Sequence, residues 1–320
     1  MIDVVSLGEL LIDFTCLSAD TEGYPTMAAH PGGAVANFLA ALAKFGTKTA
    51  LIGKVGNDAF GKLLLGTLQK AGIGAEGMVI DDSVFTTLAF VTLDETGDRE
   101  FSFARKPGAD TQIRFEEIDL SVIDQARAFH FGTLSLTDEP AKTATQKVIA
   151  YAKEKGKLIT FDPNLRKPLW HSLEDAKAQM LWGLRQADVV KISDEEVEFL
   201  FGLGVREGAK HILDNFGVKL VFVTCGADGC WFSNGTASAH VPGLSGLKVV
   251  DTTGAGDIFG GSAVWKLLQT GKTPEALSEE ELTEITTFAC TAAGLSTTKH
   301  GGISSVPELS QVLERLAQNG

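Results

Sequence analysis

Asp251-Thr-Thr-Gly-Ala-Gly-Asp257 lies between a predicted strand, residues 248–250, and an apolar segment predicted to form a helix, residues 255–268. Its two glycines allow the backbone to turn tightly and to approach a ligand closely. The amides at its end would then point out of a helix N-terminus, forming an anion hole suited to a phosphoryl group. The final aspartate has two interpretations: a catalytic carboxylate beside this hole, or a carboxylate that only caps the helix.

Outward from this segment, strand-like and helix-like segments alternate along most of the chain. The predicted strands are residues 2–7, 49–52, 128–131, 157–161, 189–192, 219–224 and 230–233, and the predicted helices are residues 31–45, 58–71, 255–268, 279–298 and 307–317. Apolar strands that alternate with amphipathic helices are typical of a parallel sheet covered on both faces. The sequence therefore predicts one three-layer α/β/α domain over residues 1–320, with a mostly parallel central sheet.

Residues 87–103 depart from this alternation. Two β-like runs, residues 87–93 and 99–103, flank Asp94-Glu-Thr-Gly97, a pattern that predicts an antiparallel hairpin. Such an excursion could be a small lid, a dimerisation sheet or a plain edge hairpin, and the sequence leaves these open.

Composition and charge exclude several function classes. The chain is 44% hydrophobic and 22% charged, an ordinary globular composition. It has neither an apolar run of about 18 residues nor a basic-then-apolar start, so we expect a cytoplasmic protein without membrane contact. Its net charge of −13 and lack of a basic cluster argue against nucleic-acid binding. The same charge would repel ATP, so a phosphate site must be built from backbone N–H groups, a helix N-terminus and cations.

Three other kinds of site are disfavoured by spacing. The four cysteines, at positions 16, 225, 230 and 290, show no zinc-binding spacing and are expected to be free thiols. The first strand runs into Gly8-Glu-Leu-Leu-Ile-Asp13, which lacks the glycine pattern of a dinucleotide site. Gly56-Asn-Asp-Ala-Phe-Gly-Lys62 approaches a phosphate-binding P-loop, but Leu63 replaces the hydroxyl that would hold magnesium.

Two signatures carry a resemblance to a known family. Gly32-Gly-Ala-Val-Ala-Asn37 and the segment from Asp251 to Val264 resemble the N- and C-terminal signatures of the ribokinase-type (PfkB) sugar kinases. Phe161-Asp-Pro-Asn-Leu-Arg-Lys-Pro-Leu-Trp170 and Lys191-Ile-Ser-Asp-Glu-Glu196 are similar to the fructokinases within that family. The resemblance implies a ribokinase-like fold in which residues 10–30 and 84–110 contribute the β-lid.

The resemblance also implies a sugar site. Asp257 would take the proton from the sugar hydroxyl, with Gly254, Ala255 and Gly256 supplying the anion hole. The substrate-binding positions that it implies, besides Asp257, are Asp13, Gly32, Gly33, Asn37, Phe103, Arg105 and Arg166. Two arginines near the sugar could bind a carboxylate, so a sugar acid such as 2-keto-3-deoxygluconate is an alternative substrate. Either arginine could instead form only a surface ion pair.

The family's nucleotide and cation sites carry over in the same way. Glu196 would organise Mg²⁺ through water, although Ser193 replaces the family's asparagine, and Ser193 with Glu196 also predicts a helix N-terminus. The implied ATP site comprises Thr224, Gly226, Gly229, Gly254, Gly256 and Cys290, where the family often has asparagine in place of the cysteine. The implied K⁺ site comprises Asp251, Thr253, Ser296, Lys299, Gly301 and Ser305.

Together these residues predict an ATP-dependent sugar kinase that phosphorylates the 6-hydroxyl of D-fructose. The enzyme alternative is 2-keto-3-deoxygluconate kinase or another sugar kinase of the family, and the non-enzyme alternative is a catalytically silent sugar sensor. The expected partners are a small-molecule sugar, ATP with Mg²⁺ and K⁺, and a second copy of the chain bound through the β-lid.

Overall fold

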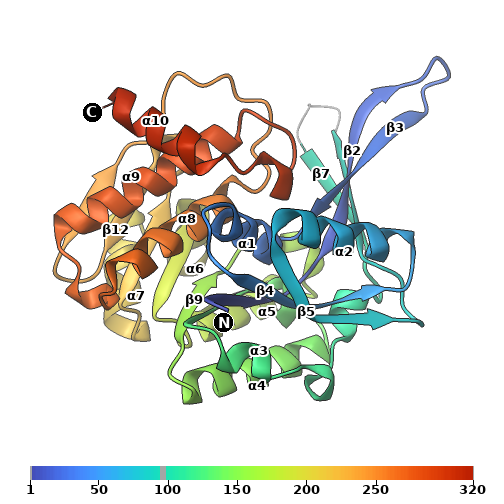
Figure 1. Cartoon of the computed structure of the whole chain (residues 1–320), viewed down its shortest axis with the longest axis horizontal. Helices are drawn as coiled ribbons and strands as arrows, with labels where there is room; N and C mark the ends of the chain where they lie inside the picture. The colour runs from blue at the N-terminus through green and yellow to red at the C-terminus, as the bar shows by residue number, and fades with distance from the viewer. Residues whose placement is uncertain (1, 94–98, 320) are drawn as a thin grey trace.

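A computed structural model describes residues 2–93 and 99–319, which form one large and one small β-sheet (Figure 1). Within these ranges, the order of strands in the large sheet is β13-β12-β11-β10-β9-β8-β1-β4-β5. The strands are β1 (Val4–Leu7), β4 (Thr49–Gly56), β5 (Ile73–Asp81), β8 (Ala128–Gly132), β9 (Leu158–Asp162), β10 (Val189–Ser193), β11 (Leu220–Thr224), β12 (Cys230–Ser233) and β13 (Ser238–Val241). Neighbours pair in parallel from β5 to β11, and β12 and β13 extend the sheet in antiparallel pairs. The predicted mostly parallel sheet is confirmed.

Helices cover both faces of the large sheet (Figure 1). One layer consists of α1 (Ala34–Lys44), α2 (Ala59–Ala71), α8 (Ala255–Thr270), α9 (Glu279–Ser296) and α10 (Leu309–Asn319). The other consists of α3 (Ser121–Asp124), α4 (Ala141–Glu154), α5 (Leu173–Leu184), α6 (Asp194–Phe201) and α7 (Val205–Phe216). The predicted three-layer α/β/α architecture is therefore confirmed. None of these helices is long and apolar enough to span a bilayer.

The small sheet stands out from the body of the molecule (Figure 1). Its order is β3-β2-β6-β7, from β2 (Leu11–Ala19), β3 (Pro25–Gly32), β6 (Leu88–Leu93) and β7 (Arg99–Ala104). The β2–β3 and β6–β7 pairs are antiparallel, and β2 pairs with β6 in parallel. The predicted hairpin is confirmed, although its predicted turn, residues 94–97, lies outside the described residues.

Two local predictions differ from the structure, and two strands of the large sheet were missed. Residues 248–250 are irregular rather than a strand, because the N–H groups of Val250 and Asp251 both donate to the Thr297 carbonyl and tether this segment to the end of α9. The helix predicted over residues 31–45 begins at Ala34, since the residues before it end β3. The edge strands β5 and β13 were not predicted.

Candidate active site

Asp257 lies in the first turn of α8 and is 8% exposed. Its Oδ2 accepts a hydrogen bond from Nδ2 of Asn37 at 2.9 Å, and its Oδ1 accepts one from Nδ2 of Asn164 at 3.3 Å. The N-cap of α8 is Gly254, and no side chain caps the helix. Asp257 is therefore not a cap; it is a carboxylate oriented by two amides from distant segments. Asn164 was not among the predicted site residues.

Burial and charge act on this carboxylate in opposite directions. Burial raises the pKa of Asp257, while the Asn37 hydrogen bond and the positive charges of Lys191 and Arg166 lower it. The net effect is a raised pKa. A carboxylate with a raised pKa is a better general base, because the optimum lies near the working pH.

The glycine turn at the start of α8 packs directly against Asn37. Gly254 has a φ of 77°, and a Cβ there would lie 2.9 Å from Cα of Gly302 and 3.1 Å from Nδ2 of Asn37. A Cβ on Gly302 would lie 2.2 Å from Oδ1 of Asn37. Both positions therefore require glycine for the turns to bring Asn37 against the helix start.

The backbone amides that were predicted to form an anion hole lie at this helix start, and one of them already has an acceptor. The N–H of Ala255 donates to the Thr252 carbonyl at 3.2 Å and so is already occupied. Among the described contacts, the N–H groups of Gly254, Gly256 and Asp257 have no acceptor within the protein. These three amides are the ones available to an anion, because the first N–H groups of a helix lack intrahelical partners.

Asp13 on β2 faces the same site. Burial raises its pKa to about 6, and the charges of Asp257 and Asp251 add to this rise while Arg166 opposes it. A Cβ on Gly32 would lie 2.2 Å from Oδ2 of Asp13. The structure therefore brings Asp13 to Gly32 and within electrostatic reach of Asp257.

The small sheet places an aromatic side chain in register with Asp13. Asp13 pairs with Ala89 on β6, and Ala89 pairs with Phe103 on β7, so the three residues share one face of the sheet. Phe103 also lines a cleft of about 550 Å³ together with Trp170 and His171. Ser102 and Phe103 of β7 contribute the small sheet's part of the cleft wall.

The two predicted arginines occupy different environments. The Arg105 guanidinium is 5% exposed and donates to Asp110, to Oγ1 of Thr137 and to the Leu134 carbonyl, each at 2.8 Å. These partners use both edges of the guanidinium, so the interpretation of Arg105 as an ion-paired residue fits better than a grip on a substrate carboxylate. Arg166 is exposed and lowers the pKa of both Asp13 and Asp257.

Glu196 forms the predicted helix N-terminus at α6. Its N–H donates to Oγ of Ser193, and its Oε2 accepts the Ser193 N–H at 2.9 Å. These two reciprocal hydrogen bonds form a capping box. Its Oε1 accepts the Leu165 N–H at 2.7 Å. The carboxylate is buried and fixed, and each oxygen retains a second lone pair toward which a water of hydrated Mg²⁺ could donate.

Lys191 and Asp162 lie beside the start of α8 and were not among the predicted site residues. Nζ of Lys191 lies 3.0 Å from Oδ2 of Asp162, and a Cβ on Gly256 would lie 3.0 Å from the same Nζ. Burial raises the pKa of Asp162 to about 6 against the opposing charge of Lys191. An ammonium therefore lies beside the anion hole. The available signal was its position at the end of a predicted strand, in Lys191-Ile-Ser-Asp-Glu-Glu196.

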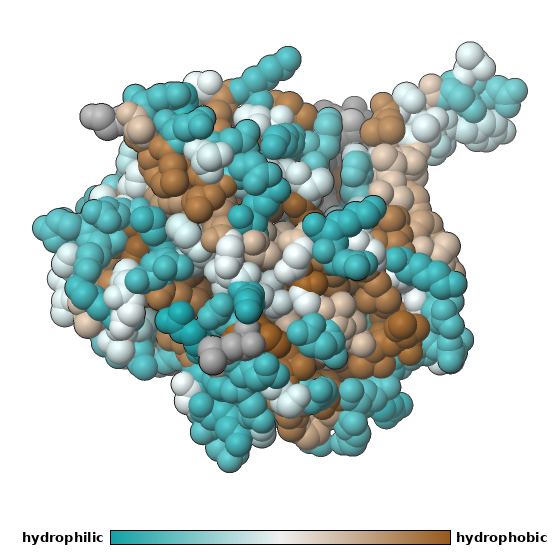
Figure 2. Space-filling model, in the orientation of Figure 1, coloured by the Kyte–Doolittle hydropathy of each residue, from teal (hydrophilic) through white to brown (hydrophobic). Residues whose placement is uncertain are grey.

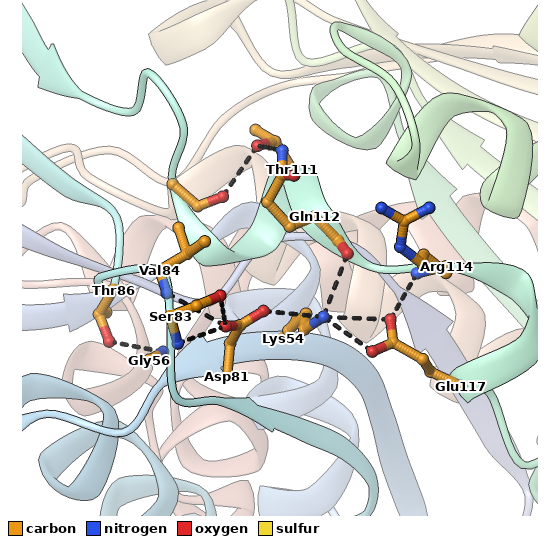
Figure 3. A network of polar contacts seen from close by, with 11 residues as sticks. Lys54, Gly56, Asp81, Ser83, Val84, Thr86, Thr111, Gln112, Arg114 and Glu117 are labelled. Carbon is orange, nitrogen blue, oxygen red and sulfur yellow. Dashed lines mark hydrogen bonds and ion pairs between the residues drawn. The ribbon is translucent and has the colours of Figure 1, made fainter.

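A second buried lysine, Lys54, has a full set of acceptors for its ammonium group (Figure 3). Nζ of Lys54 lies 2.9 Å from Asp81, 2.9 Å from Glu117 and 3.2 Å from the Gln112 carbonyl. Three acceptors match the three protons of an ammonium group. Lys191 has a single such acceptor among the described residues, Asp162, so its ammonium retains capacity for a ligand.

The implied nucleotide site combines the glycine turn at the start of α8 with residues at the end of β11 and on α9. Thr224 ends β11, and the turn η5 (Gly226–Asp228) follows it. Gly229 has a φ of 99°, and a Cβ there would lie 2.1 Å from the Val241 carbonyl oxygen. Cys290 on α9 is 8% exposed, and burial raises its thiol pKa to about 12, so it presents a neutral, apolar surface.

Asp251 joins the glycine turn to the segment after α9. Its Oδ1 accepts from the N–H and the hydroxyl of Thr253 at 2.9 and 2.7 Å, and its Oδ2 accepts from the Gly301 N–H at 3.0 Å. Lys299 and Ser305 of the implied cation site belong to the same segment, and Ser296 ends α9, where its carbonyl accepts the Lys299 N–H. One carboxylate among neutral carbonyls is a donor set that suits a monovalent cation.

Comparisons with known proteins agree over nearly the whole chain. The profile of the pfkB family carbohydrate kinases matches residues 1–309. Fructokinase-2 of Solanum lycopersicum is 41% identical over 316 residues, covering 98% of this chain and 95% of the relative. The crystal structure of fructokinase with bound ATP from Xylella fastidiosa superposes with a TM-score of 0.91 at 30% identity, covering 100% and 99% of the two chains.

A fructokinase double mutant from Vibrio cholerae, solved with fructose, ADP and a potassium ion, superposes with a TM-score of 0.84 at 30% identity and covers 98% of both chains. The residues that the family profile matches include both glycine segments and Asp257. The chain belongs to the pfkB family of carbohydrate kinases.

Proposed function

We propose that this protein is an ATP-dependent fructokinase that transfers the γ-phosphoryl group of ATP to the 6-hydroxyl of D-fructose. The observation that carries the proposal is the Asp257 carboxylate, which Asn37 and Asn164 orient beside the free amides of the α8 N-terminus. The fructokinase relatives and the fructokinase that was solved with fructose and ADP support the choice of sugar.

The proposed chemistry is positioning combined with electrostatic stabilisation. The sugar oxygen attacks the γ-phosphorus, the bond from that phosphorus to the β–γ bridging oxygen breaks, and ADP leaves. Asp257 accepts the proton of the attacking hydroxyl. The amides of Gly254 and Gly256 face the charge that develops on the equatorial oxygens.

Two cations are part of the proposal. Mg²⁺ would neutralise charge on the phosphates of ATP, and Glu196 is the buried carboxylate placed to hold one of its waters. K⁺ would bind at Asp251 and the carbonyls of the segment after α9, and so stiffen the turn that carries the anion hole. ATP itself would occupy the turn after β11, with Cys290 offering apolar contact in place of a base-specific hydrogen bond.

A coupled ADP-release assay with fructose, ribose, glucose and 2-keto-3-deoxygluconate tests the proposal. Fructose should give the highest kcat/KM. Preference for the sugar acid would replace the proposed substrate, but Arg105 is already paired with Asp110, which leaves no bidentate site for a substrate carboxylate there. Fructose binding without turnover of any sugar would favour the sensor alternative.

The small sheet is the proposed lid and dimer contact. It supplies Asp13 and Phe103, so its movement would open or close the sugar site. Leu17 and Tyr24, near the projecting end of the small sheet, are 63% and 65% exposed. Figure 2 shows apolar surface on the part of the small sheet that adjoins the body of the molecule. Small-angle scattering should show a dimer that becomes more compact with fructose, whereas a monomer unchanged by the sugar would count against both roles.

A further inference from the structure

Glu9 is a buried carboxylate without a role in the proposed chemistry. It follows β1, is 2% exposed, and accepts a hydrogen bond from the Ala34 N–H at 2.6 Å. Ala34 is the first residue of α1, whose N-cap is Gly33 and has no side-chain cap of its own. Glu9 therefore caps α1 from another segment, and its negative charge suits the positive end of the helix dipole.

The helix end that Glu9 holds is part of the sugar site. Gly33 has a φ of 121°, and a Cβ there would lie 2.4 Å from the carbonyl oxygen of Glu9, so the backbones of the two segments are in direct contact. One turn later, Asn37 donates its N–H to the Gly33 carbonyl and its side-chain amide to Asp257. A shift of this helix end would move a sugar-binding glycine and the residue that orients the base.

The charges around Glu9 extend to the small sheet. Arg105 and Asp110 are the charged groups that face it, and they act on its pKa in opposite directions. Asp110 binds Arg105 and accepts a hydrogen bond from the hydroxyl of Thr87, whose carbonyl accepts the N–H of Ile12 on β2. The Arg105 guanidinium thus binds Asp110 directly and acts on Glu9 through its charge, and these buried charges lie between α1 and the proposed lid.

We propose that Glu9 is a positioning residue of the sugar site, whose charged carboxylate holds the start of α1 so that Gly33 and Asn37 meet the sugar and Asp257. Burial raises the pKa of Glu9 to about 7, against the effect of the backbone N–H groups that it accepts. Both charge states are therefore populated near neutral pH, and sugar affinity follows the charged fraction. The proposal rests on the proposed sugar-kinase function.

The first test separates a site role from a structural one. Glu9→Gln keeps the acceptor oxygen and removes the charge, and we expect the KM for fructose to rise about tenfold because charge-assisted hydrogen bonds are roughly twice as strong as neutral ones. The KM for ATP should stay unchanged, since the turn after β11 is not touched. The control is Asp58→Ala, which removes a carboxylate cap from the start of α2, a helix without site residues.

We expect Asp58→Ala to lower the unfolding temperature and to leave both KM values unchanged. The proposal is overturned if Glu9→Gln leaves the KM for fructose unchanged, or if it raises the KM for ATP equally. Glu9→Ala, where it folds, should raise the KM for fructose more than Glu9→Gln does.

The second test uses pH. Asp13 and Asp257 titrate alike in the wild type and in Glu9→Gln. The kcat/KM of the wild type for fructose, divided by that of Glu9→Gln, therefore isolates the effect of Glu9. This ratio should be near one at low pH and rise about tenfold through a midpoint near 7; a flat ratio would refute the role. Wild-type turnover of fructose tests the proposed function alone, and if another sugar is turned over, the same ratio is measured with that sugar.

Discussion

Replacing Asp257 with Asn keeps the shape of the side chain and removes its negative charge. In the wild type, both carboxylate oxygens accept amide hydrogen bonds, from Asn37 and Asn164. The substituted amide has one oxygen, so its NH₂ group must face one of these two donors. Asn37 can resolve the conflict by rotating its amide, because its Oδ1 is buried without a partner among the described residues and would then accept from the new NH₂.

These contacts set the expected magnitudes. With the rotation, Asp257→Asn should cost about 1 kcal/mol of stability, and at most about 3 kcal/mol if one buried donor stays unpaired. Loss of a general base should lower kcat by about 10²- to 10⁴-fold, which corresponds to roughly 3 to 5 kcal/mol of activation free energy. Fructose affinity should change little, since Asp13 and Gly33 are untouched.

The assay measures kcat by coupled ADP release, fructose binding by calorimetry and the unfolding temperature, all on one preparation of the variant. A folded Asp257→Asn protein that binds fructose and retains more than about a tenth of wild-type kcat would refute the assignment of Asp257 as the base. An equal loss of fructose affinity and kcat would instead assign Asp257 to sugar binding.

Four further predictions follow from the site. Lys191→Met should lower kcat about 100-fold, whereas Lys54→Met should lower the unfolding temperature and leave kcat intact; similar kcat losses in both would remove Lys191 from the site. Gly254→Ala should lower kcat at least about tenfold, because a side chain at its φ of 77° is strained and meets Gly302; wild-type kcat would contradict the tight turn. Initial rates should be higher with potassium than with sodium at matched ionic strength, and equal rates would remove the cation site. Asp13→Asn should lower kcat/KM for fructose about 10- to 100-fold at pH 8 and less at pH 5, because the pKa of Asp13 is about 6; a loss independent of pH would contradict this.

The parts of the site that the sequence predicted are those with local causes. A positive φ at Gly254 or Gly33 demands glycine, and these glycines stand beside polar residues at helix starts, so both signatures are visible in single short segments. The Ser193–Glu196 capping box is local for the same reason.

The missed site residues depend on partners distant in the sequence. Glu9 meets Ala34 across 25 residues, Lys191 meets Asp162 across 29, and Asn164 meets Asp257 across 93. Each is a common polar residue, and although Asn164 and Lys191 lie in the segments similar to fructokinases, nothing local assigned them a partner. Only the fold brings the partners together.

Two misjudged elements show that strand formation depends on neighbours as well as residue type. Val249 and Val250 have strand-forming side chains, but they are 59% and 43% exposed and lie beside no strand. The edge strand β5 contains two glycines, which weaken its local signal. A Cβ on Gly77 would lie 2.8 Å from the Leu51 carbonyl oxygen, so the close approach of β5 to β4 requires glycine there. The same glycine lowers the strand propensity of the segment.

The sequence positions of the two asparagines that bind Asp257 have a consequence for synthesis of the protein. They come from residues 220 and 93 positions earlier in the chain, and Gly302, which closes the turn around Asn37, follows later still. A nascent chain on the ribosome can therefore complete most of the parallel sheet before any reactive centre exists. Prematurely terminated chains that lack the last helices should therefore consume no ATP.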